Sequence, residues 1–364
     1  RFFSRGVVEA AMRQAAFDEA VAWALRNGFS DHQIPEFKTF LSLCARGHID
    51  GEHIIGSKYL DKGAFGSVEK ATYLGTPVAV KKLGDVRTDK KLPQMLREAL
   101  LEINILQGLH HPHIVTFLGC STHFPPAQDK READGDDNQE EAGGAQQQQQ
   151  RPLISMVFEL CERGSLASLM HERLEKLPWS TKMTIAQELG MGVAYLHSLG
   201  VMHRDLNTRN VLLTRDLRVR IADFGCARKA EQGRSYSSST ISGSPPYMAP
   251  EQLVGALLTV KIDVWAFGTI LWELGAEAIP WASHTRCTLG EIKERVCDKG
   301  EGLPRLHPVC VPDDPPGWRA EFDAVIGGCL MLRAEERPEM LQVLNALLRY
   351  NVLRGESTDA GEGG

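Results

Sequence analysis

The chain has 364 residues, of which 43% are hydrophobic and 24% are charged, values typical of a soluble globular protein with two or three folded units. Seven acids and two bases between Pro125 and Gln150 carry most of the formal charge of −6, so no charge argument favours nucleic acid or a membrane as a partner. Eight cysteines without a C-x-x-C pair argue against a zinc site or a disulfide framework, and without a signal-peptide pattern or an apolar run approaching roughly 20 residues the expected compartment is the cytoplasm.

The first predicted element is a helical extension over residues 1–53. Apolar residues up to about residue 25 recur on one helical face, and Phe37, Phe40 and Leu43 suggest a second, short helix. We interpret the extension as a cap packed on the domain that follows. The alternative is an autoinhibitory or docking segment that binds a regulatory partner.

The pattern changes at Ile54 to short β-rich runs broken by glycine. Strands are expected at residues 54–55, 67–72, 77–83, 114–118 and 153–160, with a helix over 92–109. Residues 124–151 are rich in Gln, Asp and Gly and are predicted to form a disordered insertion. From Gly164 the chain is mostly helical, apart from a loop-rich stretch over 203–251 and a flexible tail over 349–364. This order predicts a β-rich unit and a larger helical unit with a ligand cleft between them.

Two glycines in a predicted strand turn are candidates for phosphate binding. Gly63 and Gly66 would let backbone N–H groups approach phosphate oxygens without a Cβ in the way, although any hairpin could contain such a pair. An alternating strand then ends at Lys81, a side chain that either faces solvent or binds phosphates. Residues 51–58 read G-x-x-x-x-G-S-K, with Ser and Lys in the wrong order for a phosphate-binding P-loop.

The most specific segment lies in the loop-rich stretch. Residues 203–210 read H-R-D-L-N-T-R-N, and residues 223–225 read D-F-G. Asp205 can accept a hydrogen bond from an attacking hydroxyl, and Asn210 can bind a divalent cation. Asp223 supplies a second hard oxygen ligand.

Residues 243–251 read G-S-P-P-Y-M-A-P-E, and residues 263–268 read D-V-W-A-F-G. With these motifs in order, the chain resembles the eukaryotic protein kinases over about residues 54–348. The resemblance implies an α+β bilobal fold: a small antiparallel β-sheet N-lobe with helix C over 54–161 and a larger, mainly helical C-lobe over 162–348. It also implies transfer of the γ-phosphate of ATP to protein hydroxyls in signal transduction, with Mg²⁺ as cofactor.

The resemblance assigns roles to particular residues. Lys81 matches the strand-3 lysine and Glu102 its partner on helix C, Asp205 and Asn207 lie in the catalytic loop, and Asn210 and Asp223 match the metal ligands. The positions implied to bind the nucleotide are Gly63, Phe65, Gly66, Val68, Ala79, Lys81, Phe158, Glu159, Cys161 and Leu212, with backbone groups of Glu159 and Cys161 reading the adenine edge. An apolar column of Leu106, Phe117, His203 and Phe224 and a structural ion pair between Glu251 and Arg337 are also implied.

Two departures from the family pattern leave alternatives open. Asp61 stands where the first loop glycine is usual, and Asn207 stands where Ser/Thr kinases usually carry lysine. The Asp-Leu-Asn run resembles LIM kinases and their relatives in the tyrosine-kinase-like group, which include dual-specificity enzymes, whereas Gly243-Ser244 resembles Ser/Thr kinases. We therefore expect a Ser/Thr kinase, with a dual-specificity or Tyr kinase and a nucleotide-binding pseudokinase scaffold as alternatives.

Two further clusters invite interpretation. Hydroxyl side chains crowd residues 235–242, and a phosphate on one of them could dock on Arg204 and order the segment. His110, His111 and His113 look like zinc ligands, but they occupy the loop after helix C, where this family commonly has His-Pro. We therefore interpret them as structural residues.

Overall fold

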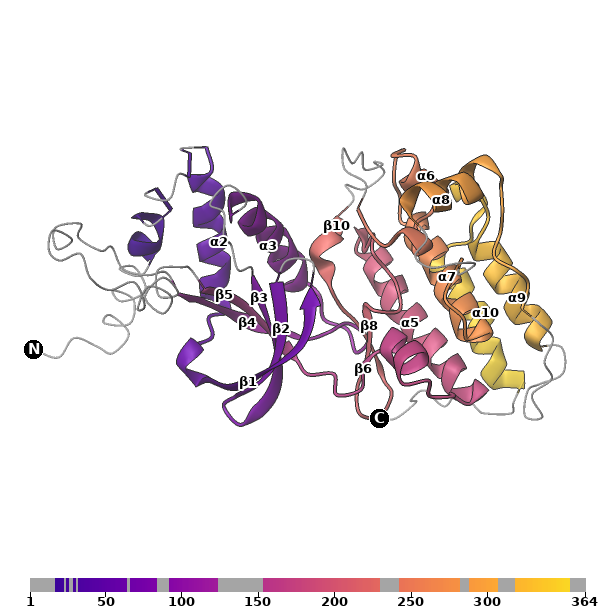
Figure 1. Cartoon of the computed structure of the whole chain (residues 1–364), viewed down its shortest axis with the longest axis horizontal. Coiled ribbons are helices and arrows are strands. Elements are labelled where there is room, and N and C mark those ends of the chain that lie inside the picture. The colour runs from indigo at the N-terminus through magenta and orange to yellow at the C-terminus, as the bar shows by residue number, and fades with distance from the viewer. Residues whose placement is uncertain are drawn as a thin grey trace, which may run out of the picture. The chain divides into compact units, whose positions relative to one another are not determined.

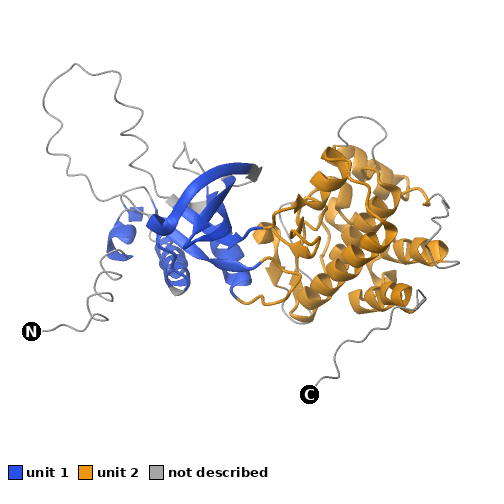
Figure 2. Ribbon diagram, turned by 90° about the horizontal axis from the view of Figure 1, so that it is seen from below, with its two compact units in different colours: residues 1–107, 116–160 blue, residues 108–115, 161–364 orange. Residues whose placement is uncertain are grey.

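The computed structural model describes residues 17–22, 24–25, 29–30, 32–63, 66–83, 92–123, 153–229, 242–281, 288–306 and 318–353. The predicted insertion, Phe65, most of the hydroxyl cluster and the end of the predicted tail lie outside the described residues. The chain divides into two compact units, one of residues 1–107 and 116–160 and the other of residues 108–115 and 161–364 (Figure 2). We call them unit 1 and unit 2.

Unit 1 is built on a five-stranded antiparallel sheet in the order β1-β2-β3-β5-β4 (Figure 1). Its strands are β1 (Ile54–Gly63), β2 (Gly66–Tyr73), β3 (Thr76–Leu83), β4 (Phe117–His123) and β5 (Leu153–Glu159). Its helices include α2 (Ile34–Arg46), the single turn η1 (Gly51–His53) and α3 (Leu92–Leu106). Residues 17–22 and 24–25, within the first predicted helix, are also helical. Alternation along β3 buries Val78 and Val80 in a small core with Val157 of β5.

Unit 2 is mainly helical. Its helices are α5 (Trp179–Ser198), α6 (Pro250–Leu253), α7 (Lys261–Ala276), α8 (Leu289–Lys293), α9 (Trp318–Cys329) and α10 (Met340–Leu353). Single turns are η4 (Ser168–Glu172), η5 (Phe224–Cys226), η6 (Pro245–Tyr247), η7 (Glu294–Asp298) and η8 (Ala334–Glu336). Helix α7 is buried without interruption from Ile262 to Leu274, as expected for a helix that is apolar on every side.

Short strands in unit 2 carry the predicted functional loops. A three-stranded sheet has the order β6-β8-β9, formed by β6 (Gly164–Ser165), β8 (Val211–Leu213) and β9 (Val219–Ile221). A two-stranded sheet pairs β7 (Val201–Met202) with β10 (Arg228–Lys229). The segment of residues 203–210 therefore leaves β7 and enters β8, so both of its ends are held by strands.

The predicted α+β fold class is confirmed, but two predicted strands are wrong in their bounds. The strand expected at residues 54–55 continues as β1 to Gly63. Residues 114–118 were expected to form a strand, whereas β4 begins at Phe117. Val115 N donates to Ile221 O at 2.9 Å and Ile221 N donates to His113 O at 2.8 Å, so residues 113–115 pair with β9 in unit 2. An apolar run shows that a segment is buried but not which sheet it joins.

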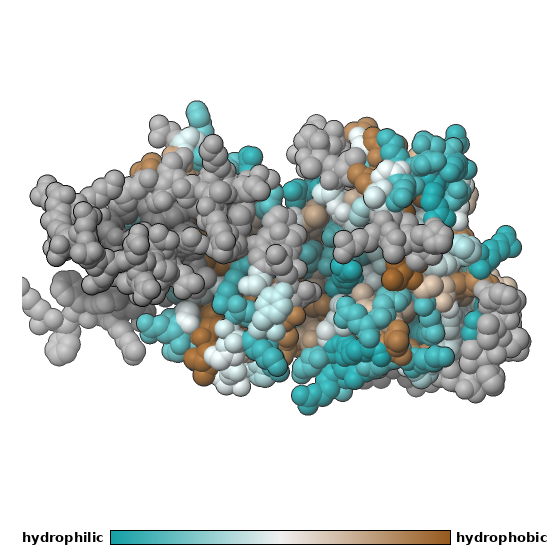
Figure 3. All heavy atoms as spheres, viewed as in Figure 1, coloured by the Kyte–Doolittle hydropathy of each residue, from teal (hydrophilic) through white to brown (hydrophobic). Residues whose placement is uncertain are grey.

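On the face seen in Figure 3, the apolar side chains of the described residues lie in small groups. The face in Figure 3 is mostly hydrophilic, with separate apolar side chains between the polar ones, which is normal for a globular surface. Within the described residues, the helices are all too short or too polar to cross a bilayer.

Candidate active site

In unit 1, strand β3 and helix α3 bring Lys81 and Glu102 together. Lys81 Nζ lies 2.7 Å from Glu102 Oε1 and 3.0 Å from Oε2, so the predicted ion pair is present. Only 11% of the lysine side chain and 3% of the glutamate side chain are exposed. A buried charge pair of this kind is tolerated because each charge neutralises the other at hydrogen-bond distance.

The predicted nucleotide-binding residues of unit 1 lie on neighbouring strands. Val68 of β2 is the cross-strand partner of Lys81, and Ala79 of β3 is the partner of Phe158. Gly63 and Gly66 face each other where β1 turns into β2. The predicted residues therefore share one region of the sheet.

Glu159, the last residue of β5, holds this end of the sheet. Its carboxylate accepts hydrogen bonds from the backbone N and the hydroxyl of Thr116, both at 2.7 Å. Glu159 N donates to Thr116 O at 3.0 Å, so β5 and the residue before β4 are joined three times. Phe158 packs on Phe117 with ring centroids 5.5 Å apart.

In unit 2, two donors hold Oδ1 of the Asp205 carboxylate. Oδ1 accepts from Asn207 Nδ2 at 3.0 Å and from Ser244 N at 2.8 Å. Asn207 Nδ2 also lies 3.2 Å from Ser244 Oγ, so the asparagine connects the two segments. Asp205 is half-buried, and its carboxylate is held in place by these donors.

Asn207 and Asn210 fold the segment of residues 203–210, which we call the catalytic segment after its predicted role, on itself. Asn207 Oδ1 accepts from the backbone N of Arg209 at 2.9 Å and of Asn210 at 3.2 Å. Asn210 Nδ2 donates to Asp205 O at 2.8 Å and lies 3.3 Å from Asp205 Oδ2. With its amide nitrogen committed to Asp205, Asn210 keeps its amide oxygen as an acceptor or metal ligand.

Asp263 of α7 anchors the start of this segment. Its two carboxylate oxygens accept from His203 N and Arg204 N, both at 2.9 Å, and His197 Nε2 lies 3.1 Å from Oδ2. Burial alone would raise the pKa of Asp263, but the hydrogen bond and charge of His197, the charge of His203 and the amide of Arg204 outweigh it and lower that pKa. A charged group therefore stays inside unit 2 because the backbone around the catalytic segment needs it as an acceptor.

A close approach of two backbones brings Ser244 to Asp205. Gly243 has φ +121°, a conformation that favours glycine, and a Cβ there would lie 2.8 Å from Arg204 O. Arg204 in turn donates from Nη2 to Ser242 Oγ at 3.2 Å and from Nη1 to Cys226 O at 3.3 Å. Of the predicted phosphorylation segment, Ser242 thus contacts the arginine suggested as its dock.

Sequence reasoning missed a buried polar network around Glu273 of α7. Tyr247 OH donates to Oε2 at 2.6 Å, Thr208 Oγ1 donates to Oε1 at 3.1 Å, and His171 Nε2 lies 2.6 Å from Oε1. Burial, followed by the charge of Glu273, raises the pKa of Tyr247 well above its usual value. One carboxylate thereby ties the catalytic segment to the 243–251 segment. The available signal was Glu273 itself, an acid that follows a long apolar run in α7.

The D-F-G segment starts in an unusual backbone conformation. Asp223 has φ +60°, in the left-handed region, which non-glycine residues adopt at a cost of about 1–3 kcal/mol and often at functional sites. The ring of Phe224 packs edge-on against His203 at 5.0 Å, and His203 Nε2 lies 3.0 Å from Ala222 O. These contacts form the unit 2 half of the predicted apolar column.

The cysteines near this region are structural in character. Cys161 is buried at the start of unit 2. Burial, with a smaller effect of the carboxylates of Asp205 and Asp223, raises the pKa of the Cys226 thiol. A thiol with a raised pKa carries little thiolate, so the structure favours Cys226 as an apolar residue over a reactive one.

Oxygen donors in unit 2 fit a magnesium ion. The amide oxygen of Asn210 and the carboxylate of Asp223 are hard ligands of the kind Mg²⁺ accepts while keeping several waters. Among the described residues, no group of three or more His, Cys, Asp and Glu side chains is placed to hold a metal ion. A site of this type would therefore bind its cation through few protein ligands and the phosphates of a substrate.

The histidines after α3 have structural partners. His111 stacks on Tyr195 of α5 at 4.8 Å, and His113 Nδ1 lies 3.4 Å from Val219 O. Burial lowers the pKa of both histidines. These contacts fasten residues 108–115 to unit 2.

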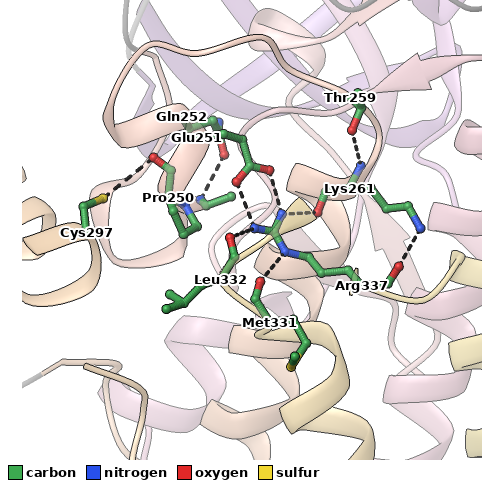
Figure 4. Close-up of polar contacts among 10 residues, drawn as sticks. Pro250, Glu251, Gln252, Thr259, Lys261, Cys297, Met331, Leu332 and Arg337 are labelled. Carbon is green, nitrogen blue, oxygen red and sulfur yellow. Dashed lines mark hydrogen bonds and ion pairs between the residues drawn. The ribbon is translucent and has the colours of Figure 1, made fainter. Parts of the chain in front are cut away.

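The predicted ion pair between Glu251 and Arg337 is confirmed (Figure 4). Arg337 Nη1 and Nη2 donate to the two carboxylate oxygens of Glu251 at 2.6 and 2.8 Å. The guanidinium also donates to the carbonyl oxygens of Met331, Leu332 and Lys261. This arginine therefore holds four chain segments of unit 2 together.

Comparisons with known proteins agree with these motifs. A family model described as "Protein kinase domain" matches residues 55–348. The chain is 32% identical over 290 residues to "Probable serine/threonine-protein kinase drkA" of Dictyostelium discoideum. The match covers 79% of this chain and 38% of that relative. It is 29% identical over 291 residues to "Serine/threonine-protein kinase CTR1" of Arabidopsis thaliana. That match covers 78% of this chain and 30% of the relative. The chain thus spans less than two fifths of the length of these relatives.

Proposed function

Because this chain belongs to the protein kinase family, we propose that it transfers the γ-phosphoryl group of ATP to Ser and Thr hydroxyls of protein substrates. The observation that carries this proposal is the orientation of Asp205 by Asn207 and Ser244. Phosphoryl transfer is catalysed mainly by positioning and charge stabilisation, so an oriented carboxylate is what the reaction requires. The relatives named as serine/threonine kinases support the same reaction.

The family resemblance and the contacts of the side chains support the following roles in catalysis. Asp205 would accept a hydrogen bond from the attacking hydroxyl and orient it. Lys81, held by Glu102 at 2.7 Å, would bind the α- and β-phosphates. Asn210 and Asp223 would hold Mg²⁺, which supplies positive charge to the phosphate oxygens.

The adenine and the phosphates would contact further residues. Apolar side chains from the strands and the backbone of the hinge suit a flat aromatic base, whereas glycines suit phosphates. We assign the base to Val68, Ala79, Phe158, Leu212 and the backbone of Glu159 and Cys161, and the phosphates to Gly63, Phe65 and Gly66. The domain extents that accompany this proposal are residues 54–161 for the N-lobe, including the 124–151 insertion, and 162–348 for the C-lobe.

The preference for Ser and Thr rests on Ser244. Its backbone N donates to Asp205 and its hydroxyl lies 3.2 Å from Asn207 Nδ2. The hydroxyl thus belongs to the group that orients the catalytic carboxylate, an arrangement that resembles Ser/Thr kinases. Asn207 keeps a hydrogen-bond donor where a lysine is usual but lacks the charge.

A phosphotransfer assay tests this proposal. The purified chain is incubated with Mg²⁺, γ-labelled ATP and a generic basic protein, and phosphoamino-acid analysis identifies the acceptor. We expect phosphoserine and phosphothreonine, with Asp223→Ala inactive. Phosphotyrosine would favour the dual-specificity alternative, and ATP binding without transfer would favour a pseudokinase.

A further inference from the structure

Helix α2 of the N-terminal extension packs along α3, the helix that carries Glu102 (Figure 1). The buried side chains of α2 share one face of the helix and are Phe37, Phe40, Leu41 and Cys44. The buried apolar side chains of α3 are Ala99, Ile103 and Leu106. The predicted cap is thus present for α2, and its apolar face is used within unit 1.

Polar contacts tie α2 to α3 on both sides of Glu102. Arg97 Nη2 lies 2.8 Å from Glu36 Oε1, and Gln107 Nε2 donates to Leu43 O at 3.1 Å. The Arg97–Glu36 pair is exposed and contributes little by itself. The two contacts nevertheless set the register of α2 along α3.

The end of α2 is fastened to the sheet at Cys120 of β4. Cys120 N donates to Gly47 O at 2.9 Å, and Ile49 N donates to Cys120 O at 2.8 Å. Gly119 has φ +153°, and a Cβ there would lie 2.2 Å from Gly47 O, so this glycine permits the approach of the segment. The thiols of Cys44 and Cys120 are hydrogen-bonded, which, with burial, raises the pKa of Cys44.

Cross-strand neighbours connect the attachment point of α2 at Cys120 to Lys81. Met156 of β5 is the cross-strand partner of both Cys120 on β4 and Lys81 on β3. Cys120 and Lys81 therefore lie in one row across three strands. Helix α3 is held to that row twice, directly through the Glu102–Lys81 pair and indirectly through α2.

We propose that residues 34–49 are a positioning element for the kinase reaction, which holds α3 so that Glu102 stays on Lys81. This inference rests on the proposed function, because the pair matters for binding of phosphates. The element acts through Glu102 and touches no substrate. Because residues 34–49 are part of the same chain, no separate partner is needed to hold α3 where Glu102 pairs with Lys81.

Phe40→Ala tests the proposal, with Phe322→Ala in α9 as a matched control. Both phenylalanines are almost fully buried, at 1% and 2% exposure, but Phe322 packs on Trp179 and Trp318 in unit 2. Steady-state rates with Mg²⁺-ATP are measured at a temperature where thermal unfolding shows each variant folded. We expect kcat to fall on the order of tenfold to a hundredfold for Phe40→Ala, as for a small displacement of a catalytic group. Phe322→Ala should keep the wild-type kcat, and Phe40→Leu should restore most of it.

A double-mutant cycle with Glu102→Gln shows whether the effect passes through the ion pair. Glu102→Gln removes the negative charge that pairs with Lys81. In this background, Phe40→Ala should cause little additional loss of kcat. An equal loss in both backgrounds, unchanged kcat in Phe40→Ala, or a rise in kcat, as an autoinhibitory segment would give, overturns the proposal. If Phe40→Ala does not fold, Gln107→Met replaces it in the kinetic measurements and in the double-mutant cycle. This variant removes only the donor to Leu43 O, and the same outcomes overturn the proposal.

Hydrogen exchange separates failure of this inference from failure of the proposed function. The amides of α3 around Glu102 should exchange at least about tenfold faster in Phe40→Ala, and at the wild-type rate in Phe322→Ala, whether or not the chain phosphorylates a substrate. Unchanged exchange in α3 would contradict the positioning role even in an active enzyme.

Discussion

Asn207 donates its side-chain amide to the carboxylate of Asp205, with Nδ2 3.0 Å from Oδ1. The same nitrogen lies 2.9 Å from Asp205 O and 3.2 Å from Ser244 Oγ. Asn207 therefore uses its side-chain amide in internal hydrogen bonds that orient the carboxylate of Asp205, the group to which the proposed function gives the catalytic role. This relationship makes Asn207 the most informative site for testing the proposed mechanism.

Asn207→Asp should lower kcat by on the order of a hundredfold, because it removes the donor to Asp205 and places a second carboxylate beside it. KM for ATP should change little, since the contacts of Asn207 are to protein groups. Steady-state kinetics measures both quantities. Asn351→Asp, at a side chain hydrogen-bonded to Gln187 in α5, is the matched control and should leave kcat unchanged. Wild-type kcat in Asn207→Asp would contradict the orienting role.

Tyr247→Phe should weaken the link between the 243–251 segment and α7. Its hydroxyl donates to the buried carboxylate of Glu273 at 2.6 Å, and loss of a hydrogen bond to a charged group costs about 1.5–3 kcal/mol. We expect a lower free energy of unfolding and a lower kcat, measured by denaturant titration and by the phosphotransfer assay. Tyr195→Phe serves as comparison, because its hydroxyl accepts from the exposed amide of His110, which water can satisfy. Equal effects of the two variants would contradict this account.

Arg337→Met should destabilise unit 2 strongly. The arginine side chain is fully buried, and removing one partner of a buried pair costs about 3–5 kcal/mol. Thermal and urea unfolding measure the loss. Arg333→Met is the matched control, since its side chain is 73% exposed and lies 3.8 Å from Glu336. That variant should change the free energy of unfolding by less than about 0.5 kcal/mol.

Stability should fall as pH is lowered below about 6.5, the ordinary pKa of histidine. Burial lowers the pKa of His113 in the folded state, with Arg218 and Arg220 adding to this effect and a hydrogen bond to Val219 opposing it. The unfolded chain therefore binds more protons than the folded chain. The contribution of His113 to the free energy of unfolding is complete above about pH 6.5 and is lost as pH falls through the pKa of His113 in the folded state. Burial raises the pKa of Glu188, so the contribution of this residue to the free energy of unfolding changes with pH in the opposite direction.

The measurement for this prediction is urea unfolding of wild type and His113→Gln between pH 7.5 and 5, a range chosen to bracket roughly the ordinary histidine pKa. The variant should lose less stability than the wild type over this range, because its side chain does not titrate. A steeper loss in the variant would show that His113 is protonated in the folded state and paired with Glu188, which lies 3.6 Å away.

Several features were predictable from local sequence. The order of the motifs indicated the family, and the resemblance to that family implied two ion pairs that the structure contains, Lys81–Glu102 and Glu251–Arg337. Identification of the family succeeded because each motif is a short segment that can be read without the rest of the fold.

Other features depended on the tertiary structure alone. His171 and Glu273 are 102 residues apart, and neither segment indicates the other. The apolar face of α2 was visible in the sequence, but its packing on α3 and its attachment to Cys120 were not. Periodicity reveals that a face is buried, whereas the surface that buries it is decided by the path of the whole chain. For this protein the sequence therefore determined which residues can carry the chemistry, and the folded chain decided which residues hold them in place.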